Sequence, residues 1–187
     1  QECLRWWDYW LKGTATGIME EPMLRVWMPE SVAPKTHYEF RPGRWVAEPL
    51  CPPENPAAQT WYLNRSGLNQ TLETEKPLLF PTSQAVGLNA GVWFPMGAAG
   101  EFPGDQRSAD SGSLCFTSEV FAAGMEILGN PEVTVRLNCD KPKALLAARL
   151  CDVAPDGTSL LVSWGLLNLT HSNSHEDPQA LIPGKKF

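Results

Sequence analysis

One segment, residues 132–170, restricts the fold of this chain more than any other, because its pattern predicts three consecutive strands. Residues 133–139 alternate apolar and polar side chains, which is typical of a half-buried strand. Residues 145–150 present apolar side chains on both faces, as expected of a strand covered on both sides. A Pro-Asp-Gly turn within residues 154–158 then leads into the third strand, since proline presets φ and glycine tolerates a positive φ. The segment predicts a β-sandwich and indicates no chemistry.

Proline is abundant in this chain, with 17 residues in 187, or about 9% against a usual share of ~5%. Proline removes backbone hydrogen bonds from helices and from strand ladders. Many short elements joined by loops are therefore favoured over long helices. The length and the 43% share of hydrophobic residues suffice for one buried domain, or for one domain and a fragment of another.

Charge, hydropathy and cysteine usage limit the partners and the compartment. The formal net charge of −6 argues against nucleic acid or an anionic membrane as the main partner. No apolar run reaches the ~20 residues that a membrane-spanning helix needs. The five cysteines are an odd number without C-x-x-C spacing, and Cys139 and Cys151 fall in apolar strands, where a thiol behaves as a small hydrophobe. We expect reduced structural cysteines in a cytoplasmic protein, with neither nucleic acid nor a membrane as partner.

The amino-terminal residues predict a short aromatic helix. Apolar side chains recur at helical spacing within residues 2–12, and they include Trp6, Trp7 and Trp10. Gly13 follows, where a glycine in the left-handed conformation would close the helix. Three tryptophans on so short a helix must bury against a large surface, and the helix is marginal alone. The interpretation is a helix that belongs to a neighbouring body of protein, followed by a linker at residues 14–21.

The middle of the chain predicts short strands separated by turn signals. The candidates are residues 23–28, 36–41, 60–64, 78–80, 91–94, 114–118 and 125–128. Residues 95–112 form a loop rich in Gly, Asp and Ser, and loops of this length usually pack on or gate something. The pattern fits an antiparallel sandwich or a jelly roll.

Signals of catalysis are missing from this chain. The G-x-S-x-G motif that is typical of α/β hydrolases does not occur in the sequence. None of the three histidines comes with a serine or cysteine partner that the pattern places beside it. We therefore assign no catalytic residue and expect no cofactor.

Two polar clusters are candidate cation sites, and each has a simpler interpretation. His171 and His175 have the i, i+4 spacing of two metal ligands on a helix, but their segment is rich in Ser and Asn and follows a strand. A polar docking loop is favoured there. Asp105 and Asp110 offer carboxylates for Ca²⁺ without the regular oxygen spacing of a calcium loop. A local ion-pair and turn network around Arg107 is favoured instead.

Tryptophans outside the first helix allow one more interpretation. A sugar-stacking platform is conceivable for four of them, and a place in the core or at an interface is favoured. These four are Trp27, Trp45, Trp61 and Trp93.

Several segments together resemble the X-Pro dipeptidyl-peptidase/cocaine esterase (CocE/NonD) family of hydrolases. The segments are residues 5–13, 17–19, 22–26, 103–107, 114–119, 129–133, 149–157 and 165–171. In that family an α/β-hydrolase domain ends in an R-W-x-D-x-W-L-K-G helix and passes into a C-terminal jelly-roll domain. Each piece is short, but the combination spans nearly the whole chain and is specific.

The resemblance implies a division of this chain. Residues 1–13 are then the last helix of an α/β-hydrolase domain, residues 14–21 a linker, and residues 22–187 a mainly β, galactose-binding-like jelly-roll sandwich. Family jelly rolls continue with further strands beyond a segment like the one ending at Phe187, so the sandwich is expected to be truncated. An incomplete sandwich exposes strand edges, which favours pairing between copies of the chain.

The resemblance also implies a function. The parent is expected to be a serine hydrolase that cleaves esters, amides or X-Pro peptides with a Ser-Asp-His triad, none of which maps onto this chain. The domain is expected to pack on its own upstream hydrolase domain and to wall the substrate entrance, and by itself to be inactive. The predicted docking residues are Trp6, Trp7, Trp10, Asp105 and Arg107. The competing interpretation is a free-standing β-sandwich module that binds carbohydrate or another ligand.

Overall fold

The computed structural model describes residues 1–51, 58–74, 76–81 and 83–186. Within them the chain forms six strands that pair as three separate two-stranded antiparallel sheets, β1–β2, β3–β4 and β5–β6. Contacts divide the chain into two compact units, which are described in turn. None of the helices in the described residues has the length and apolarity to span a membrane.

The first unit comprises Gln1–Glu30, Pro42–Gln59 and Gly124–Gly129. Its helix α1, Glu2–Lys12, is the helix that the sequence predicts. Gly13 ends it at φ 65 and donates its backbone N–H to the carbonyl of Tyr9 over 3.1 Å, which is the expected glycine cap.

The segment that follows α1 is folded back onto the helix. Arg5 donates to the carbonyl of Thr16 over 3.2 Å and also pairs with Glu21. A short 3-10 helix, η1 at Ile18–Glu20, lies between these two contacts. The Arg5 hydrogen bond is the main reason why the pKa of Glu21 lies below its usual value. The expected linker thus has a defined structure.

The first unit also contains a strand pair. Strand β1, Leu24–Pro29, agrees with the prediction for residues 23–28, and it pairs with β2, Gly43–Glu48. Trp27 lies opposite Trp45 in the register, with ring centroids 5.6 Å apart and an interplanar angle of 75°. No strand was predicted from the sequence where β2 lies.

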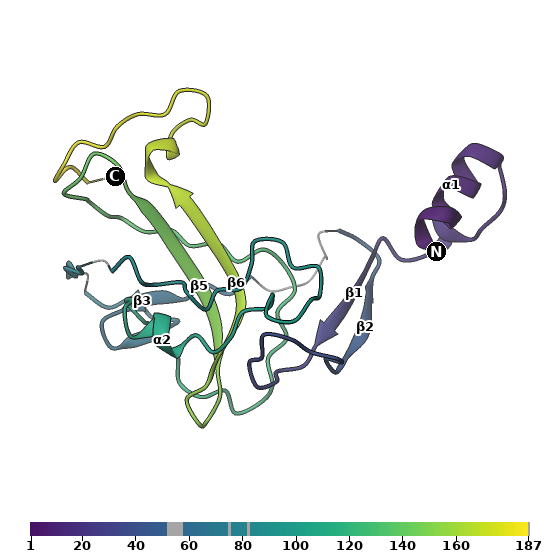
Figure 1. Cartoon of the computed structure of the whole chain (residues 1–187), viewed down its shortest axis with the longest axis horizontal. Helices are drawn as coiled ribbons and strands as arrows, with labels where there is room; N and C mark the ends of the chain where they lie inside the picture. The colour runs from purple at the N-terminus through teal and green to yellow at the C-terminus, as the bar shows by residue number, and fades with distance from the viewer. Residues whose placement is uncertain (52–57, 75, 82, 187) are drawn as a thin grey trace. The chain divides into compact units, whose positions relative to one another are not determined.

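The second unit comprises Ser31–Arg41, Thr60–Ala123 and Asn130–Phe187, described as far as residue 186. Its long element is the hairpin of β5, Leu145–Val153, and β6, Ser159–Asn168 (Figure 1). The predicted turn joins the two strands. Ala154 donates to the carbonyl of Thr158 over 2.9 Å, and Gly157 has φ 83. The second and third strands of the opening segment are therefore confirmed.

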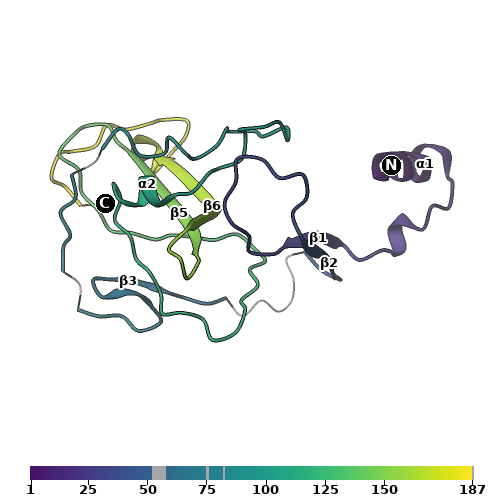
Figure 2. The same ribbon diagram turned by 60° about the horizontal axis from the view of Figure 1, so that its bottom comes forward.

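Two smaller elements complete this unit. Strands β3, Tyr62–Asn64, and β4, Gly67–Asn69, form a short hairpin at the place of one predicted strand. A single-turn helix, α2 at Arg107–Asp110, lies within the long loop and beside the β5–β6 hairpin in both views (Figure 1, Figure 2). Buried apolar side chains gather around this contact and the two ends of β6. Among the described residues they are Ala109, Leu160, Leu161 and Leu169.

Three expectations about the sheet are wrong. Residues 133–139 form no strand in the described structure, and Val133 is 52% exposed. An alternating pattern becomes a strand only where a partner strand supplies a ladder of backbone hydrogen bonds. Here the carbonyl of Cys139 accepts a hydrogen bond from the backbone N–H of Gly184, but no ladder continues from this bond. Residues 145–150 are not covered on both faces either, since Leu145 is 65% exposed. Residues 36–41, 78–80, 91–94, 114–118 and 125–128 also carry no strand.

The expected class is confirmed at a coarse level. The regular structure is mainly β, with one short helix at the amino end. The described strands form separate pairs instead of two packed sheets, so the two layers of the incomplete sandwich that was expected are not seen among them.

Candidate docking surface and loop anchor

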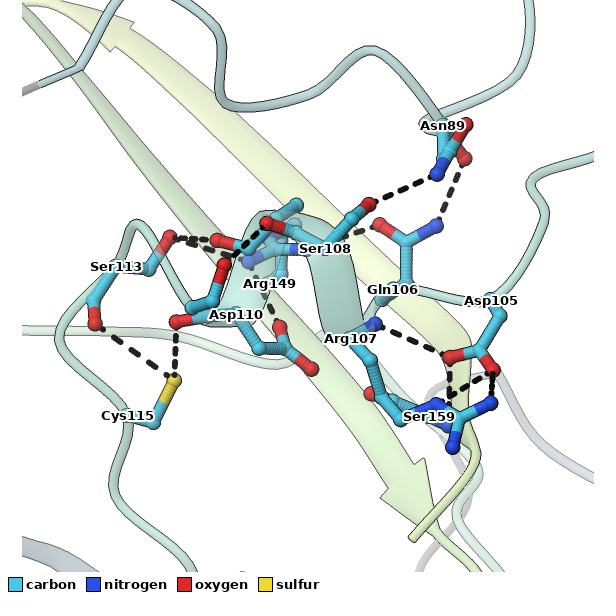
Figure 3. A network of polar contacts seen from close by, with 12 residues as sticks. Asn89, Asp105, Gln106, Arg107, Ser108, Asp110, Ser113, Cys115, Arg149 and Ser159 are labelled. Carbon is cyan, nitrogen blue, oxygen red and sulfur yellow. Dashed lines mark hydrogen bonds and ion pairs between the residues drawn. The ribbon is translucent and has the colours of Figure 1, made fainter.

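A polar network fixes the long loop to the β5–β6 hairpin, and Gln106 is its centre (Figure 3). The side chain of Gln106 is 0% exposed. Its amide nitrogen donates to the carbonyls of Asn89 and Gly104 over 2.8 and 2.7 Å, and its amide oxygen accepts from Arg149 over 2.9 Å. A buried amide is stable only where its donors and acceptor are paired, and this one is.

Arg149 supplies the charge of the network. It lies in β5 with its side chain 15% exposed. One guanidinium nitrogen bonds Gln106, and the other contacts the Asp110 carboxylate over 2.8 Å and the Ser113 hydroxyl over 3.2 Å. A charge removed from water this far needs a paired counter-charge and satisfied hydrogen bonds, and Asp110 provides the first.

Asp105 extends the network to the start of β6. Its carboxylate accepts from the backbone N–H of Ser159 over 3.2 Å and from the guanidinium of Arg107 over 2.8 Å. Ser159 in turn accepts from the backbone N–H of Gln106 over 2.9 Å. The Arg107 hydrogen bond is the main cause that lowers the pKa of Asp105 below its ordinary value of 3.8. The loop is thus joined to the first residue of β6 by bonds in both directions.

The acidic cluster therefore forms ion pairs and turn contacts, as the favoured interpretation predicted. Asp105 pairs with Arg107 as expected, whereas Asp110 pairs with Arg149. No group of three or more metal-ligating side chains gathers anywhere in the described part of the chain. The docking role of Asp105 and Arg107 stays a prediction. Arg107 retains 58% exposure of its side chain and so is accessible to a partner.

The aromatic face of α1 is the candidate docking surface. Trp6, Trp7 and Trp10 are 43%, 53% and 54% exposed, and no residue of the helix is buried. Trp6 and Trp10 contact each other with ring centroids 5.8 Å apart, and Tyr9 meets Trp10 edge-on at 5.2 Å. Trp6 and Trp10 therefore form one exposed aromatic pair, and Trp7 is exposed on the same helix. Its partner stays a prediction.

The four tryptophans proposed for sugar stacking are divided among separate aromatic pairs. Each pair is T-shaped, with interplanar angles of 74° to 82°, and a flat stacking platform needs rings that share a plane. The pairs are Trp27–Trp45, Trp61–Phe121 and Trp93–Trp164. The structure gives this interpretation no support.

His171 and His175 are brought together, although not on an α-helix. His171 ends a short 3-10 helix, η2 at Leu169–His171, and a polar turn returns the chain to it. The Nδ1 atoms of the two rings lie 3.4 Å apart.

Two of the cysteines, Cys115 and Cys151, are not activated as nucleophiles. All five are free, and the pKa values of Cys115 and Cys151 are raised, chiefly by burial. A raised pKa keeps a thiol protonated and weakly nucleophilic at neutral pH.

Sequence reasoning missed Gln106, Arg149 and Ser159. A signal existed for Arg149, because a charged residue within an apolar strand requires a buried partner. Nothing in the sequence indicated that Gln106 would be that partner, 43 positions away.

These features define a class of protein: a mainly β chain with an exposed aromatic helix and with buried polar groups that fix a loop. Comparison with known proteins agrees. Residues 16–187 match the family described as the X-Pro dipeptidyl-peptidase C-terminal non-catalytic domain, and the chain belongs to this family. The resemblance stated from the sequence is confirmed.

Two curated relatives support the assignment. A protein of Bacillus cereus and one of Bacillus anthracis, both named "Putative Xaa-Pro dipeptidyl-peptidase", are each 25% identical to this chain over 186 residues. The alignment covers 98% of this chain and 28% of each relative, so the chain spans somewhat over a quarter of their length. No solved structure matches the chain significantly.

Proposed function

We propose that this chain is the accessory C-terminal domain of a CocE/NonD-type serine hydrolase that cleaves X-Pro peptides, esters or amides. The observation that carries the proposal is the family match over residues 16–187, because this non-catalytic domain is normally part of a larger peptidase with a catalytic domain. The Ser-Asp-His triad then lies in the parent's upstream α/β-hydrolase domain.

The exposed face of α1 supports docking on that upstream domain. An 11-residue helix is marginal by itself, and its tryptophans are about half exposed. Burying one large aromatic side chain is worth about 2–3 kcal/mol. Trp6, Trp7 and Trp10 together therefore supply enough apolar surface to hold α1 against the hydrolase body.

The anchored loop supports a role at the substrate entrance. The network around Gln106 fixes its second half, while Met96 in its first half is 79% exposed. The Glu101 carboxylate accepts the backbone N–H groups of Met96 and Ala98 over 2.6 and 2.9 Å. This loop thus combines internal hydrogen bonds with an exposed apolar side chain, and ordered surface loops of this kind often line binding sites.

The detailed fold of the domain is inferred from the family. The domain is a galactose-binding-like jelly roll, and the β5–β6 pair belongs to one of its sheets. Each two-stranded pair has open edges that favour pairing between copies of the chain. The five free cysteines support a cytoplasmic location.

The parent's reading frame gives the first test of the proposal. The frame should continue upstream of Gln1 into a segment with G-x-S-x-G, and replacing that serine by alanine should abolish X-Pro p-nitroanilide hydrolysis by the whole protein. Removal of residues 22–187 should reduce that hydrolysis while the serine is intact. A frame without such a segment, or activity that survives the serine replacement, would contradict the proposal.

A further inference from the structure

The two histidines after β6 are arranged as a pair of metal ligands. Their ring centroids are 5.4 Å apart, whereas the Nδ1 atoms are only 3.4 Å apart. Both rings therefore turn Nδ1 towards the same point between them. A separation of 3.4 Å is long for a hydrogen bond between two nitrogens.

The same separation fits tetrahedral coordination. Two imidazole nitrogens at about 2.0–2.1 Å from a zinc ion, at a tetrahedral angle, lie roughly 3.3–3.4 Å from each other. His171 and His175 therefore already have the spacing that a shared ion would impose.

Local hydrogen bonds hold the loop that carries the pair. The Asn168 side chain accepts from the backbone N–H of Thr170 over 3.2 Å, at the start of η2. The Ser174 hydroxyl accepts from the N–H groups of Glu176 and Asp177, both over 3.1 Å. A backbone bond of 2.9 Å from Gln179 to Thr170 closes the loop. Holding the ligands in place before the ion binds lowers the entropy cost of binding.

We propose that His171 and His175 bind one first-row divalent transition ion of the Zn²⁺, Ni²⁺ and Cu²⁺ group. Neutral imidazole suits these ions, whereas Mg²⁺ and Ca²⁺ prefer oxygen ligands. Among the described residues no third His, Cys, Asp or Glu side chain joins the pair in a group that could hold a metal, so water would fill the remaining positions. The site is independent of the proposed docking and peptidase function.

Nuclear magnetic resonance of the histidine rings tests the site in the full, untagged chain. The chain has three histidines, and His37 is the internal control. On titration with ZnCl₂, the imidazole signals of His171 and His175 should shift together with one dissociation constant, while that of His37 stays in place. MgCl₂ should shift none of the three. The exposed thiols do not enter this readout.

Variants assign the signals and complete the test. Even a change outside the ligand shell costs 10–100-fold in metal affinity, so His171→Ala should weaken the Zn²⁺ response of His175 by about tenfold or more, and His175→Ala the reverse. His37→Ala should leave both responses unchanged. The proposal is overturned if the two rings do not respond to Zn²⁺, if His37 responds equally, or if each ring keeps its affinity when the other is removed.

Discussion

The loop anchor is the polar network that joins residues 105–113 to the β5–β6 hairpin, and Arg149 is the residue on which it depends most. It is the charged position in an otherwise apolar stretch of β5, and it joins that strand to Gln106, Asp110 and Ser113. The loop contributes three partners to one guanidinium. A single substitution should therefore remove the side-chain bonds of Gln106, Asp110 and Ser113 to β5, while the backbone bonds to Ser159 remain.

The first prediction concerns this guanidinium. Arg149→Met keeps the apolar stem but leaves the Gln106 oxygen and the Asp110 carboxylate without their partner. Hydrogen bonds to charged groups contribute roughly 1.5–3 kcal/mol, so we expect a loss of about 2 kcal/mol in the free energy of unfolding, measured by urea titration. Arg44→Met is the control, because its pair with Glu126 is more than half exposed and should matter much less. Equal losses in the two variants would contradict the anchor.

Asp105 makes the anchor dependent on pH. Its pKa in the folded chain is lowered, first by the hydrogen bond from Arg107, so the ionised carboxylate stabilises the fold. That contribution is fully present above the ordinary value of 3.8 and is lost as the pH falls through the lowered folded value. Asp105→Asn should reduce the melting temperature by a constant amount between about pH 5 and 8, and the gap should narrow below about pH 4. A gap that widens on acidification would contradict this sign. Asp140→Asn, at an 83% exposed carboxylate, serves as the control.

Gly43 is required by close packing in the β1–β2 pair. A Cβ atom there would lie 2.4 Å from the carbonyl oxygen of Met28 and 2.7 Å from the Trp27 indole nitrogen. The backbone cannot yield this much without disturbing the strand pair. Gly43→Ala should therefore destabilise the first unit, measured by the thermal change in near-ultraviolet circular dichroism of the tryptophans. Gly165→Ala is the matched control, because in the described part of the chain no neighbouring atom lies within 4 Å of the added Cβ in β6. Equal stability of the two variants would refute the packing argument.

At the scale of elements, local signals determined what could be predicted from the sequence. α1 has apolar side chains at helical spacing and is capped by Gly13, and the β5–β6 hairpin has a turn signal between its two strands. Both elements were therefore predicted with nearly correct bounds. β2 was missed because Gly43, its first residue, follows Pro42, and a Pro-Gly pair is typical of a turn. The prediction of a strand at residues 133–139 was wrong because a strand needs a partner strand, and an alternating pattern does not show whether a partner is present.

The exposed face of α1 leads to a prediction that depends on context. In the enzyme with its catalytic domain, Trp7→Ala and Trp10→Ala should each lower the stability of the interface by about 2–3 kcal/mol, seen as a lower melting temperature. In the present chain alone both side chains are about half exposed, so the same changes should matter little. Lys12→Ala removes only an exposed i, i+4 pair with Asp8, so it should have a small effect of the same size in both contexts. Losses of equal size in both contexts would contradict docking through this face.

At the scale of the whole molecule, the family and the coarse class could be predicted, and the anchor could not. Several short segments, each weak alone, indicated the family because they occurred in the right order along the chain. The anchor depends on pairs such as Gln106 and Arg149, whose separation in sequence carries no periodic signal. Hydrogen bonds between distant loops and strands are consequences of the tertiary fold.

The central claim is that this chain is a non-catalytic domain, and a turnover assay tests it most directly. Purified chain should be mixed with an X-Pro p-nitroanilide and with a p-nitrophenyl ester, beside a buffer blank and an intact serine hydrolase. We predict release of p-nitroaniline and p-nitrophenol at the rate of the blank. Saturable turnover that a serine-directed inhibitor abolishes would contradict the account.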